Sequence, residues 1–415
     1  MTNSVPMYPD SGRFMDFNIS PEFDADPTTK LLSLAKKTPV VSGREGNFCG
    51  VEIPNNFLLP DQDQDMFIAL SWDAVRQLAS DGDSFSAELA FAKTLDFTIG
   101  KSMVTMDDPE HKRYKNLVAP SFTHRIVNQE LHKVARPIIR ACLDNIVDKG
   151  ACDLLADFTS KFPFEIVAAI LGVPNAIKEE FIEANDYVFR MAEDPEGAMA
   201  ALGTLDRLCQ TVIDEHRDTP HDDMISTLLT TESNGEVLSD EEVRMFIKLI
   251  LGAGLDTTTR QTATLIFQLL NHPDQFALLR QQPELAEQAV WESLRMCGAS
   301  TGFPRIAIRD TELCGVAIPK GSGVIGSLRV PNYDETRWVD PFKFDITRPK
   351  QPIMSFNFGP HACIGQNLAV TEMRIALEEI MARMPRLRKD EARWHCAKLR
   401  GWTFRSPTQL PVQWD

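Results

Sequence analysis

The stretch Phe356-Asn357-Phe358-Gly359-Pro360-His361-Ala362-Cys363-Ile364-Gly365 indicates the fold most strongly. Its cysteine lies between a glycine-bearing loop and the start of a helix that we predict over about 365–384. Backbone N–H groups and the positive end of that helix stabilise a thiolate. Gly359 and Gly365 allow the backbone to approach a large flat ligand closely. The stretch therefore predicts a haem iron ligand, with an ordinary buried cysteine as the alternative.

Composition and charge exclude several classes of protein. The chain has 415 residues, of which 43% are hydrophobic and 25% charged, so disordered, collagen-like and coiled-coil proteins are excluded. The net charge is 43 − 59 = −16, which argues against nucleic acid or an anionic membrane as the main partner. We find no run of about 18 apolar residues and no signal peptide, so no membrane span is expected.

The eight cysteines are not spaced as a zinc finger or as a dense disulfide framework. We therefore expect a reduced, cytoplasmic protein. The chain contains neither a composition shift typical of a linker nor an internal repeat, so a single domain over residues 1–415 is expected.

The hydrophobic pattern predicts an α+β fold that is mainly helical. Short strands are expected over about 35–75, 300–330 and 395–415, and helices over about 76–295 and 364–385. The longest predicted helix runs from Glu241 to Leu270, roughly 45 Å at about 1.5 Å per residue. A helix of this length can cross a whole domain.

Ala253-Gly254-Leu255-Asp256-Thr257-Thr258 lies inside this long helix. Each glycine costs about 1 kcal/mol of helix stability relative to alanine, and close approach to a flat cofactor is one reason to accept that cost. Asp256 beside Thr257 can relay protons to a reacting oxygen. Two structural alternatives are open: Asp256 can pair with Arg260 at i+4, and Thr257 can bond to the carbonyl of Ala253.

The cysteine stretch resembles the haem-binding signature of the cytochromes P450, the haem-thiolate monooxygenases. The resemblance covers most of the chain, in order, through several separate motifs. It implies the P450 fold with the long helix over the haem, haem b as the cofactor and Cys363 as the ligand of its iron. It further assigns to the haem site Phe356, Gly359, Gly365, Ala253 and Gly254, and to proton delivery Asp256 and Thr257.

Glu292-x-x-Arg295 resembles the family's ExxR motif, whose i, i+3 spacing allows a charge-assisted pair on one helix face. The stretch 340–348 resembles the family's PERF-like region, so Arg348 is expected to complete a network that supports the cysteine loop. The proline common shortly after ExxR is missing, and Gly298-Ala299-Ser300 stands there. The loop over the haem is therefore expected to take an unusual path.

The stretch 107–115 is similar to the DPPEHxRxR element of soluble bacterial members. This resemblance places four basic side chains against the haem propionates, namely His111, Lys115, Arg305 and His361. Basic side chains are the expected partners of the two propionate carboxylates. The alternative is that these four residues are ordinary solvated cations on the surface. The family usually has arginine where Lys115 stands, and a lysine is a point charge rather than a bidentate fork.

The resemblance implies a monooxygenase that inserts one atom of O₂ into a hydrophobic small molecule such as a terpenoid, a steroid or an aromatic. No flavin or nicotinamide module is visible, so a small iron–sulfur ferredoxin and its reductase are expected to supply the electrons. The protein is expected to be a monomer. Lys112, Arg113 and Lys115 offer a basic patch for an acidic donor, and a solvated helix face explains the same charges.

Two other functions are open: a non-catalytic haem protein that binds a ligand or a gas, and a peroxide-driven haem-thiolate enzyme. The Asp256–Thr257 pair argues against both, because neither needs proton delivery from an acid beside an alcohol. The candidates for the substrate pocket are Phe91, Leu95, Phe97, Leu249, Ala253, Thr301, Phe303 and Trp402. This largely apolar set suits a hydrophobic substrate, and ordinary core positions are the alternative.

Gly321-Ser322-Gly323-Val324-Ile325-Gly326 satisfies G-x-G-x-x-G. A dinucleotide site needs a strand before this motif and a helix after it. Here a turn precedes it and Pro331 breaks any helix that follows, so we predict a hairpin instead.

Overall fold

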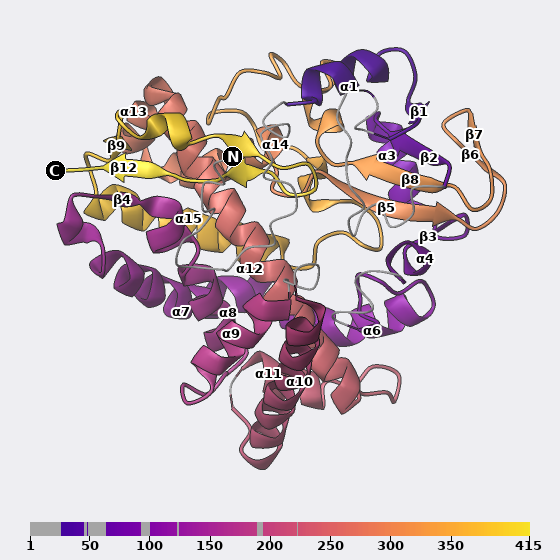
Figure 1. Ribbon diagram of the computed structural model, residues 1–415, viewed down its shortest axis with the longest axis horizontal. Coiled ribbons are helices and arrows are strands. Elements are labelled where there is room, and N and C mark those ends of the chain that lie inside the picture. Colours follow the sequence, from indigo (N-terminus) through magenta and orange to yellow (C-terminus); the bar gives the residue numbers. More distant parts are fainter. Residues whose placement is uncertain are drawn as a thin grey trace.

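The computed structural model describes residues 26–44, 48, 64–92, 100–122, 124–188, 194–221 and 223–415. Helices form most of the molecule, and a smaller β-region packs at one side (Figure 1). The prediction of a mainly helical α+β fold is therefore confirmed.

The helices fall mainly between residues 72 and 296, with one more before the C-terminal strands. Their bounds are α1 (Thr28–Ala35), α3 (Trp72–Ser80), α4 (Glu88–Phe91), α6 (Glu110–Val118), α7 (His124–Asp144), α8 (Phe162–Ile170), α9 (Lys178–Val188), α10 (Pro195–Asp218), α11 (Met224–Thr230), α12 (Asp240–Asn271), α13 (Pro273–Gln281), α14 (Ala286–Met296) and α15 (Gln366–Arg383). The short helical turns η6 (Val330–Tyr333) and η7 (Met354–Phe356) precede the cysteine loop.

The strands are short. Their bounds are β1 (Val40–Ser42), β2 (Met66–Ala69), β3 (Phe85–Ser86), β4 (Ala151–Asp153), β5 (Gly302–Ala307), β6 (Thr311–Leu313), β7 (Val316–Ile318), β8 (Gly323–Ser327), β9 (Arg388–Lys389), β10 (Leu399–Arg400), β11 (Ser406–Pro407) and β12 (Pro411–Gln413). Two of them, β3 and β4, interrupt the region that we predicted as helical. A strand of two or three residues is too short to show the alternating pattern that identifies strands.

The main sheet has the order β1-β2-β8-β5-β3 and joins distant parts of the chain. β2 runs parallel to β8, whereas β5 runs antiparallel to it, with Phe303 opposite Gly326. A Cβ added at Gly326 would lie 2.4 Å from the Phe303 ring, so this position needs a glycine. Strands from residues 40–86 and 302–327 thus form one sheet.

The G-x-G-x-x-G stretch forms a turn followed by β8, and no helix opens on it. The predicted hairpin is wrong in one respect, because the strands on either side of the turn do not pair with each other. β7 pairs with β6, and β8 pairs with β2 and β5. Gly321 adopts a positive φ of +86° in the turn, whereas Gly323 allows close packing in the main sheet, where an added Cβ would lie 2.4 Å from Met66 Sδ.

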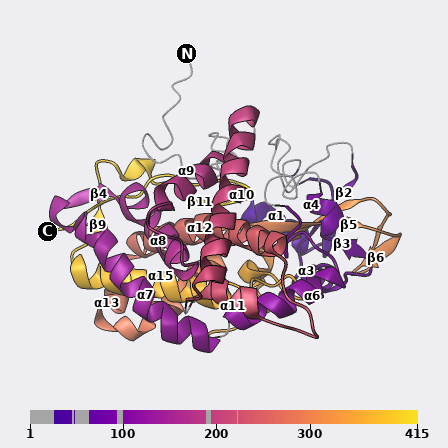
Figure 2. The same ribbon diagram turned by 90° about the horizontal axis from the view of Figure 1, so that it is seen from below.

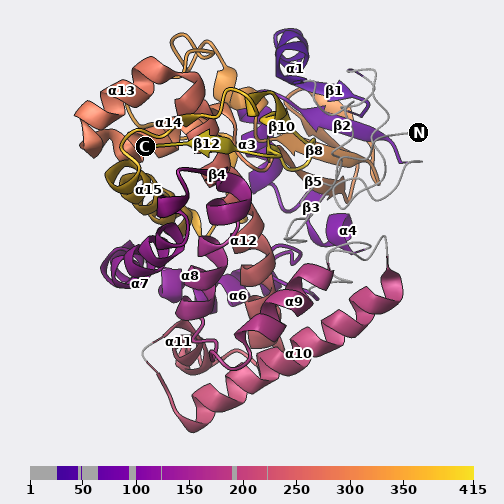
Figure 3. The same ribbon diagram turned by 60° about the vertical axis from the view of Figure 1, so that its left-hand side comes forward.

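Helix α12 spans 32 residues and passes between a group of helices and the main sheet. Figures 1, 2 and 3 show it with α7, α8 and α15 on one side and the sheet on the other. A capping box opens it: the Ser239 hydroxyl accepts from the Glu242 N–H at 3.2 Å, and the Glu242 carboxylate accepts from the Ser239 N–H at 2.8 Å. At about 1.5 Å per residue the helix is about 48 Å long.

Two hydrophobic clusters hold α12 in place. Phe246 and Leu249 in its first half pack into a cluster with α6, α8, α9 and α10, whereas Ala263 and Ile266 pack with α7, α14 and α15. Between these anchors, the surface of Ala253 is exposed. The middle of the helix is therefore rigidly held and has one open face. None of the described helices is both long and apolar enough to span a bilayer.

Candidate active site

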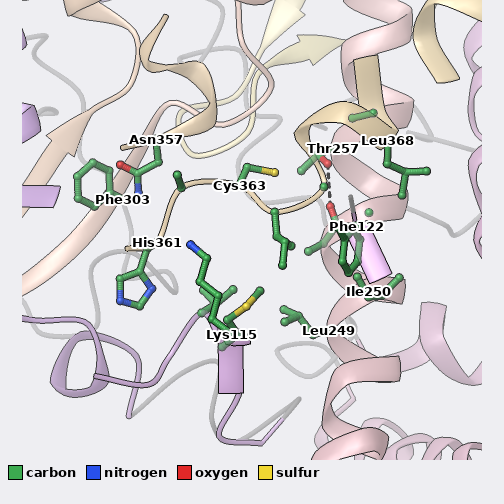
Figure 4. A pocket seen from close by; sticks show the side chains of 18 of the residues that line it. Lys115, Phe122, Leu249, Ile250, Thr257, Phe303, Asn357, His361, Cys363 and Leu368 are labelled. Atoms are coloured by element: carbon green, nitrogen blue, oxygen red, sulfur yellow. Dashed lines mark hydrogen bonds between the residues drawn. The ribbon is translucent and has the colours of Figure 1, made fainter. Parts of the chain in front are cut away.

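A cavity of about 210 Å³ lies between the open face of α12 and the cysteine loop (Figure 4). The predicted residues that line it are Phe91, His111, Lys115, Leu249, Ala253, Gly254, Thr257, Phe303, Arg305, His361, Cys363 and Gly365. These residues come from five separate parts of the sequence, and the fold brings them together at one place.

Cys363 faces this cavity from a loop that is closed by backbone hydrogen bonds. Its N–H donates to the Phe356 carbonyl at 2.9 Å, and the Ala362 N–H donates to the Gly359 carbonyl at 3.1 Å. The side chain is exposed to the cavity. Burial raises the pKa of the Cys363 thiol, whereas the Gly365 N–H and the Lys115 charge act in the opposite direction.

The two loop glycines differ in their surroundings, and Gly365 is the one that lines the cavity. Gly359 has φ +69°, and a Cβ there would lie 2.7 Å from the Ala79 carbonyl oxygen at the end of α3. Gly365 precedes α15 with an ordinary φ of −82°, and an added Cβ would meet nothing within 4 Å. Phe356 does not line the cavity, and its ring packs against Trp291 at 5.8 Å between centroids.

Four basic side chains gather at one end of the cavity. His111 and Arg305 are buried, and the His111 and His361 rings lie 4.2 Å apart. His111 Nε2 and Arg305 Nη2 are buried without a hydrogen-bond partner among the described residues. The Lys115 ammonium donates to the Pro360 carbonyl. Such a set of buried donors fits the two propionate groups of a haem.

Burial and the neighbouring positive charges lower the pKa values of side chains in this cluster. Burial lowers the pKa of Arg305 to about 10. Burial, followed by repulsion from Arg305, His111 and Lys115, lowers the pKa of His361 to about 2. The Asp108 carboxylate lies 3.4 Å from His111 and partly balances the cluster. The cluster as a whole has an excess of donors over acceptors, which again suits an anionic group.

The basic patch on α6 is weaker than its sequence indicates. Arg113 forms ion pairs with both Glu236 and Glu242, so its charge is compensated. Lys115 turns toward the cysteine loop, and Lys112 remains exposed.

Asp256 and Thr257 point in different directions from α12. The Thr257 hydroxyl lies at the cavity and donates to the Ala253 carbonyl at 2.7 Å (Figure 4). Asp256 is buried away from the cavity lining, and both of its oxygens accept from Arg260 Nε, at 2.9 and 2.7 Å. Burial raises the pKa of Asp256, and the Arg260 charge opposes this effect. Both structural alternatives noted from the sequence are therefore present.

Glu292, Arg295 and Arg348 lie together behind the cysteine loop. Arg295 forms two hydrogen bonds with Glu292, at 2.8 and 2.9 Å, and Arg348 Nε lies 3.2 and 3.3 Å from the same carboxylate. Arg295 also donates to the Asn332 carbonyl at 2.9 Å. The Asn332 side chain in turn accepts from the Met354 N–H at 2.8 Å, just before the loop. Asn332 thus links the network to the cysteine loop.

The pocket candidates divide into three groups. Phe91, Leu249, Ala253 and Phe303 line the cavity. Thr301 and Trp402 are buried behind its wall, where the Thr301 hydroxyl donates to the Trp402 carbonyl. They are therefore wrong as lining residues, because backbone pairing turns them away. Leu95 and Phe97 lie outside the described residues.

Sequence reasoning missed Glu372 on α15. It is 2% exposed, lines the cavity and has no ion pair among the described residues. Burial raises the pKa of this carboxyl well above 4.5, which favours its protonated form. The spacing of Leu368, Ala369 and Glu372 on one helix face could have indicated it.

Comparisons with known proteins identify the family. The profile described as Cytochrome P450 matches residues 196–385. Nocardicin C N-oxygenase of Nocardia uniformis subsp. tsuyamanensis is 33% identical over 75% of this chain and 79% of its own. Mycinamicin IV hydroxylase/epoxidase of Micromonospora griseorubida is 30% identical over 90% and 96%.

Solved structures agree with these relatives. The crystal structure of a versatile cytochrome P450 enzyme from Bacillus subtilis has a TM-score of 0.76 and 28% identity, and the match covers 94% of this chain and 99% of that one. A P450 from Bacillus megaterium in complex with testosterone has a TM-score of 0.81 at 24% identity, covering 94% and 100%, which shows the same fold. Haem b is the cofactor of this family, and the basic cluster beside Cys363 fits it. The chain therefore belongs to the cytochrome P450 family and is a P450 monooxygenase.

Proposed function

We propose that the chain binds haem b through Cys363 and inserts one atom of O₂ into a hydrophobic small molecule, with electrons from a ferredoxin and its reductase. One observation carries this proposal: the Cys363 thiol and four basic side chains, two of which have a buried nitrogen without a partner among the described residues, converge on a cavity whose opposite wall is the open face of α12. When bound through a cysteine thiolate, haem supplies the cleavage of the O–O bond and the oxidation of the substrate.

The basic cluster would hold the propionates. His111 Nε2 and Arg305 Nη2 are the donors that lack a partner, so they are assigned the direct contacts. Lys115 already donates to the Pro360 carbonyl and adds a point charge at the mouth of the site. The negative charges of the two propionates would also raise the pKa of Arg305 above its value in the haem-free protein.

Proton delivery is assigned to Asp256 and Thr257. The Thr257 hydroxyl would hold a water molecule at the cavity wall, since it can exchange its bond to the Ala253 carbonyl for one to water. Asp256 would receive protons from solvent at its carboxylate oxygens and pass them on after leaving Arg260. The pair would therefore move protons only after the hydrogen bonds between Arg260 and Asp256 have broken.

The cavity supports an apolar substrate. The described wall facing Cys363 includes Phe91, Leu249, Ile250 and Phe303, and the basic groups lie together at one end. A terpenoid, steroid or aromatic compound fits such a wall. A relative, the Steroid C26-monooxygenase of Mycobacterium tuberculosis, is 31% identical over 69% of this chain, and its name is consistent with this class.

The test is the absorbance difference spectrum of the dithionite-reduced protein with and without carbon monoxide. We expect the long-wavelength Soret band that gives the family its name, and its loss in Cys363→Ser. Cys396→Ser, which changes a cysteine far from the loop in sequence, is the matched control and should keep the band. A band at the shorter wavelength typical of histidine or thiol ligation in the wild-type protein would overturn the ligand assignment.

A further inference from the structure

The short segment 298–301, here called the strap, joins α14 to β5 and has little regular structure of its own. Hydrogen bonds fix it along its length. The Ala299 carbonyl accepts from the Arg405 N–H at 2.8 Å, and the Thr301 N–H donates to the Thr403 carbonyl at 3.1 Å. The C-terminal loop therefore holds one edge of the strap.

A side chain of α12 holds its other edge. Gln261 is 3% exposed, and its Oε1 accepts from the Ala299 N–H at 2.7 Å. Its Nε2 donates to the Ser293 hydroxyl of α14 at 3.1 Å, so both ends of the amide are satisfied. One buried amide thus ties together α12, α14 and the strap. Leucine or another apolar residue at position 261 would leave the Ala299 N–H without this partner, which is costly for a buried group.

The strap leads directly into the cavity wall. Phe303 and Arg305 are two residues apart on β5, so they lie on the same face of the strand, and both line the cavity. The Arg305 guanidinium lies 5.0 Å from the centre of the Phe303 ring. Any movement of the strap would therefore shift a wall residue and a propionate partner together.

Gln261 also lies one helical turn beyond Thr257, on the same face of α12. Gln261 thus provides a direct link between the helix that carries Thr257 and the segment that leads to the strand carrying Phe303. Gln261 itself does not line the cavity, so it acts through other residues.

We propose that Gln261 is a positioning residue that sets the width of the cavity between α12 and the Phe303 wall, and thereby the place of the substrate. The proposal rests on the assignment of this cavity to haem and substrate. It predicts that removing the amide changes which ligand shapes fit, while haem ligation by Cys363 is retained.

The experiment compares two ligands on the haem-loaded protein, imidazole and 4-phenylimidazole. Both bind through the same imidazole nitrogen, so the ratio of their Kd values measures the space available to the phenyl ring. We expect Gln261→Leu to change this ratio by roughly fivefold or more, because wall atoms displaced by a fraction of an ångström lose or gain contacts with that ring. Hydrogen exchange at the peptide covering the strap should also become faster in this variant.

Two further variants separate positioning from general damage. Gln268→Leu makes the same change in a buried residue two turns further along α12, and it should leave both readouts at their wild-type values. Gln261→Glu keeps an acceptor for the Ala299 N–H and should restore both readouts. Should Gln261→Leu fail to fold, Gln261→Met, which also lacks the amide, takes its place. Wild-type Kd ratios and exchange rates in a Gln261→Leu protein with an intact long-wavelength carbon monoxide band would overturn the proposal. Loss of that band in the wild-type protein would instead overturn the proposed function.

Discussion

At the scale of single residues, Glu372 presents an unusual charge state. Its pKa is raised by burial above the ordinary 4.5, so the folded state keeps a proton that the unfolded chain releases. Between these two pKa values the folded state binds more protons, and stability therefore falls as pH rises. Glu372→Gln removes this dependence. We expect the variant to be more stable than the wild type at pH 8 and to differ little near pH 4.

Denaturant unfolding of the haem-loaded proteins between pH 4 and pH 8 measures this effect. Glu215→Gln, at an exposed position on α10, is the control and should shift stability by a similar small amount at every pH. A stability difference for Glu372→Gln that does not change with pH would show that the carboxyl is ionised in the folded protein.

Asp256 allows a second prediction at this scale. Asp256→Asn keeps the shape of the side chain but cannot carry a proton. We expect oxygen-coupled product formation to fall by about 10²–10⁴-fold, the usual contribution of general acid–base catalysis, while the carbon monoxide band persists. Product formation with a surrogate ferredoxin measures this, and an unchanged rate would remove Asp256 from proton delivery.

At the scale of elements, the cysteine loop depends on a backbone conformation that glycine allows. Gly359→Ala places a Cβ at φ +69° and 2.7 Å from the Ala79 carbonyl oxygen, so we expect a loss of more than about 1 kcal/mol in stability and weaker haem retention. Gly365→Ala is the matched change in the same loop, where φ is ordinary and no atom lies within 4 Å. Chemical unfolding compares the two, and equal losses would show that the contact with α3 is unimportant.

Some features of the helices and loops could be predicted from the sequence, and others could not. α12 and the cysteine loop could be predicted because capping residues, small residues and the cysteine signature are local in sequence. The roles of Gln261 and Asn332 could not, because they depend on which distant backbone group lies opposite. Thr301 and Trp402 failed as pocket residues for the same reason, since pairing with a remote loop decides their direction.

At the scale of the whole molecule, charge distribution governs encounters with an electron donor. The chain carries −16, and the ion pairs of Arg113 leave Lys112 as the exposed cation of the α6 patch. Lys112→Glu should raise the KM for an acidic ferredoxin and weaken its dependence on salt. Lys320→Glu, in the exposed turn between β7 and β8, is the control. Equal effects of the two changes on steady-state reduction would exclude local docking at α6.

The parallel pairing of β2 with β8 has a consequence for biosynthesis. A nascent chain can pair β2 with β1 early, yet its parallel partner β8 is translated only after α12 and α14, and the cysteine loop follows later still. Long-range pairing of this kind is slow to form and leaves apolar surface uncovered during translation. The haem pocket therefore closes only near the end of synthesis, and the growing chain is expected to need chaperone protection until then.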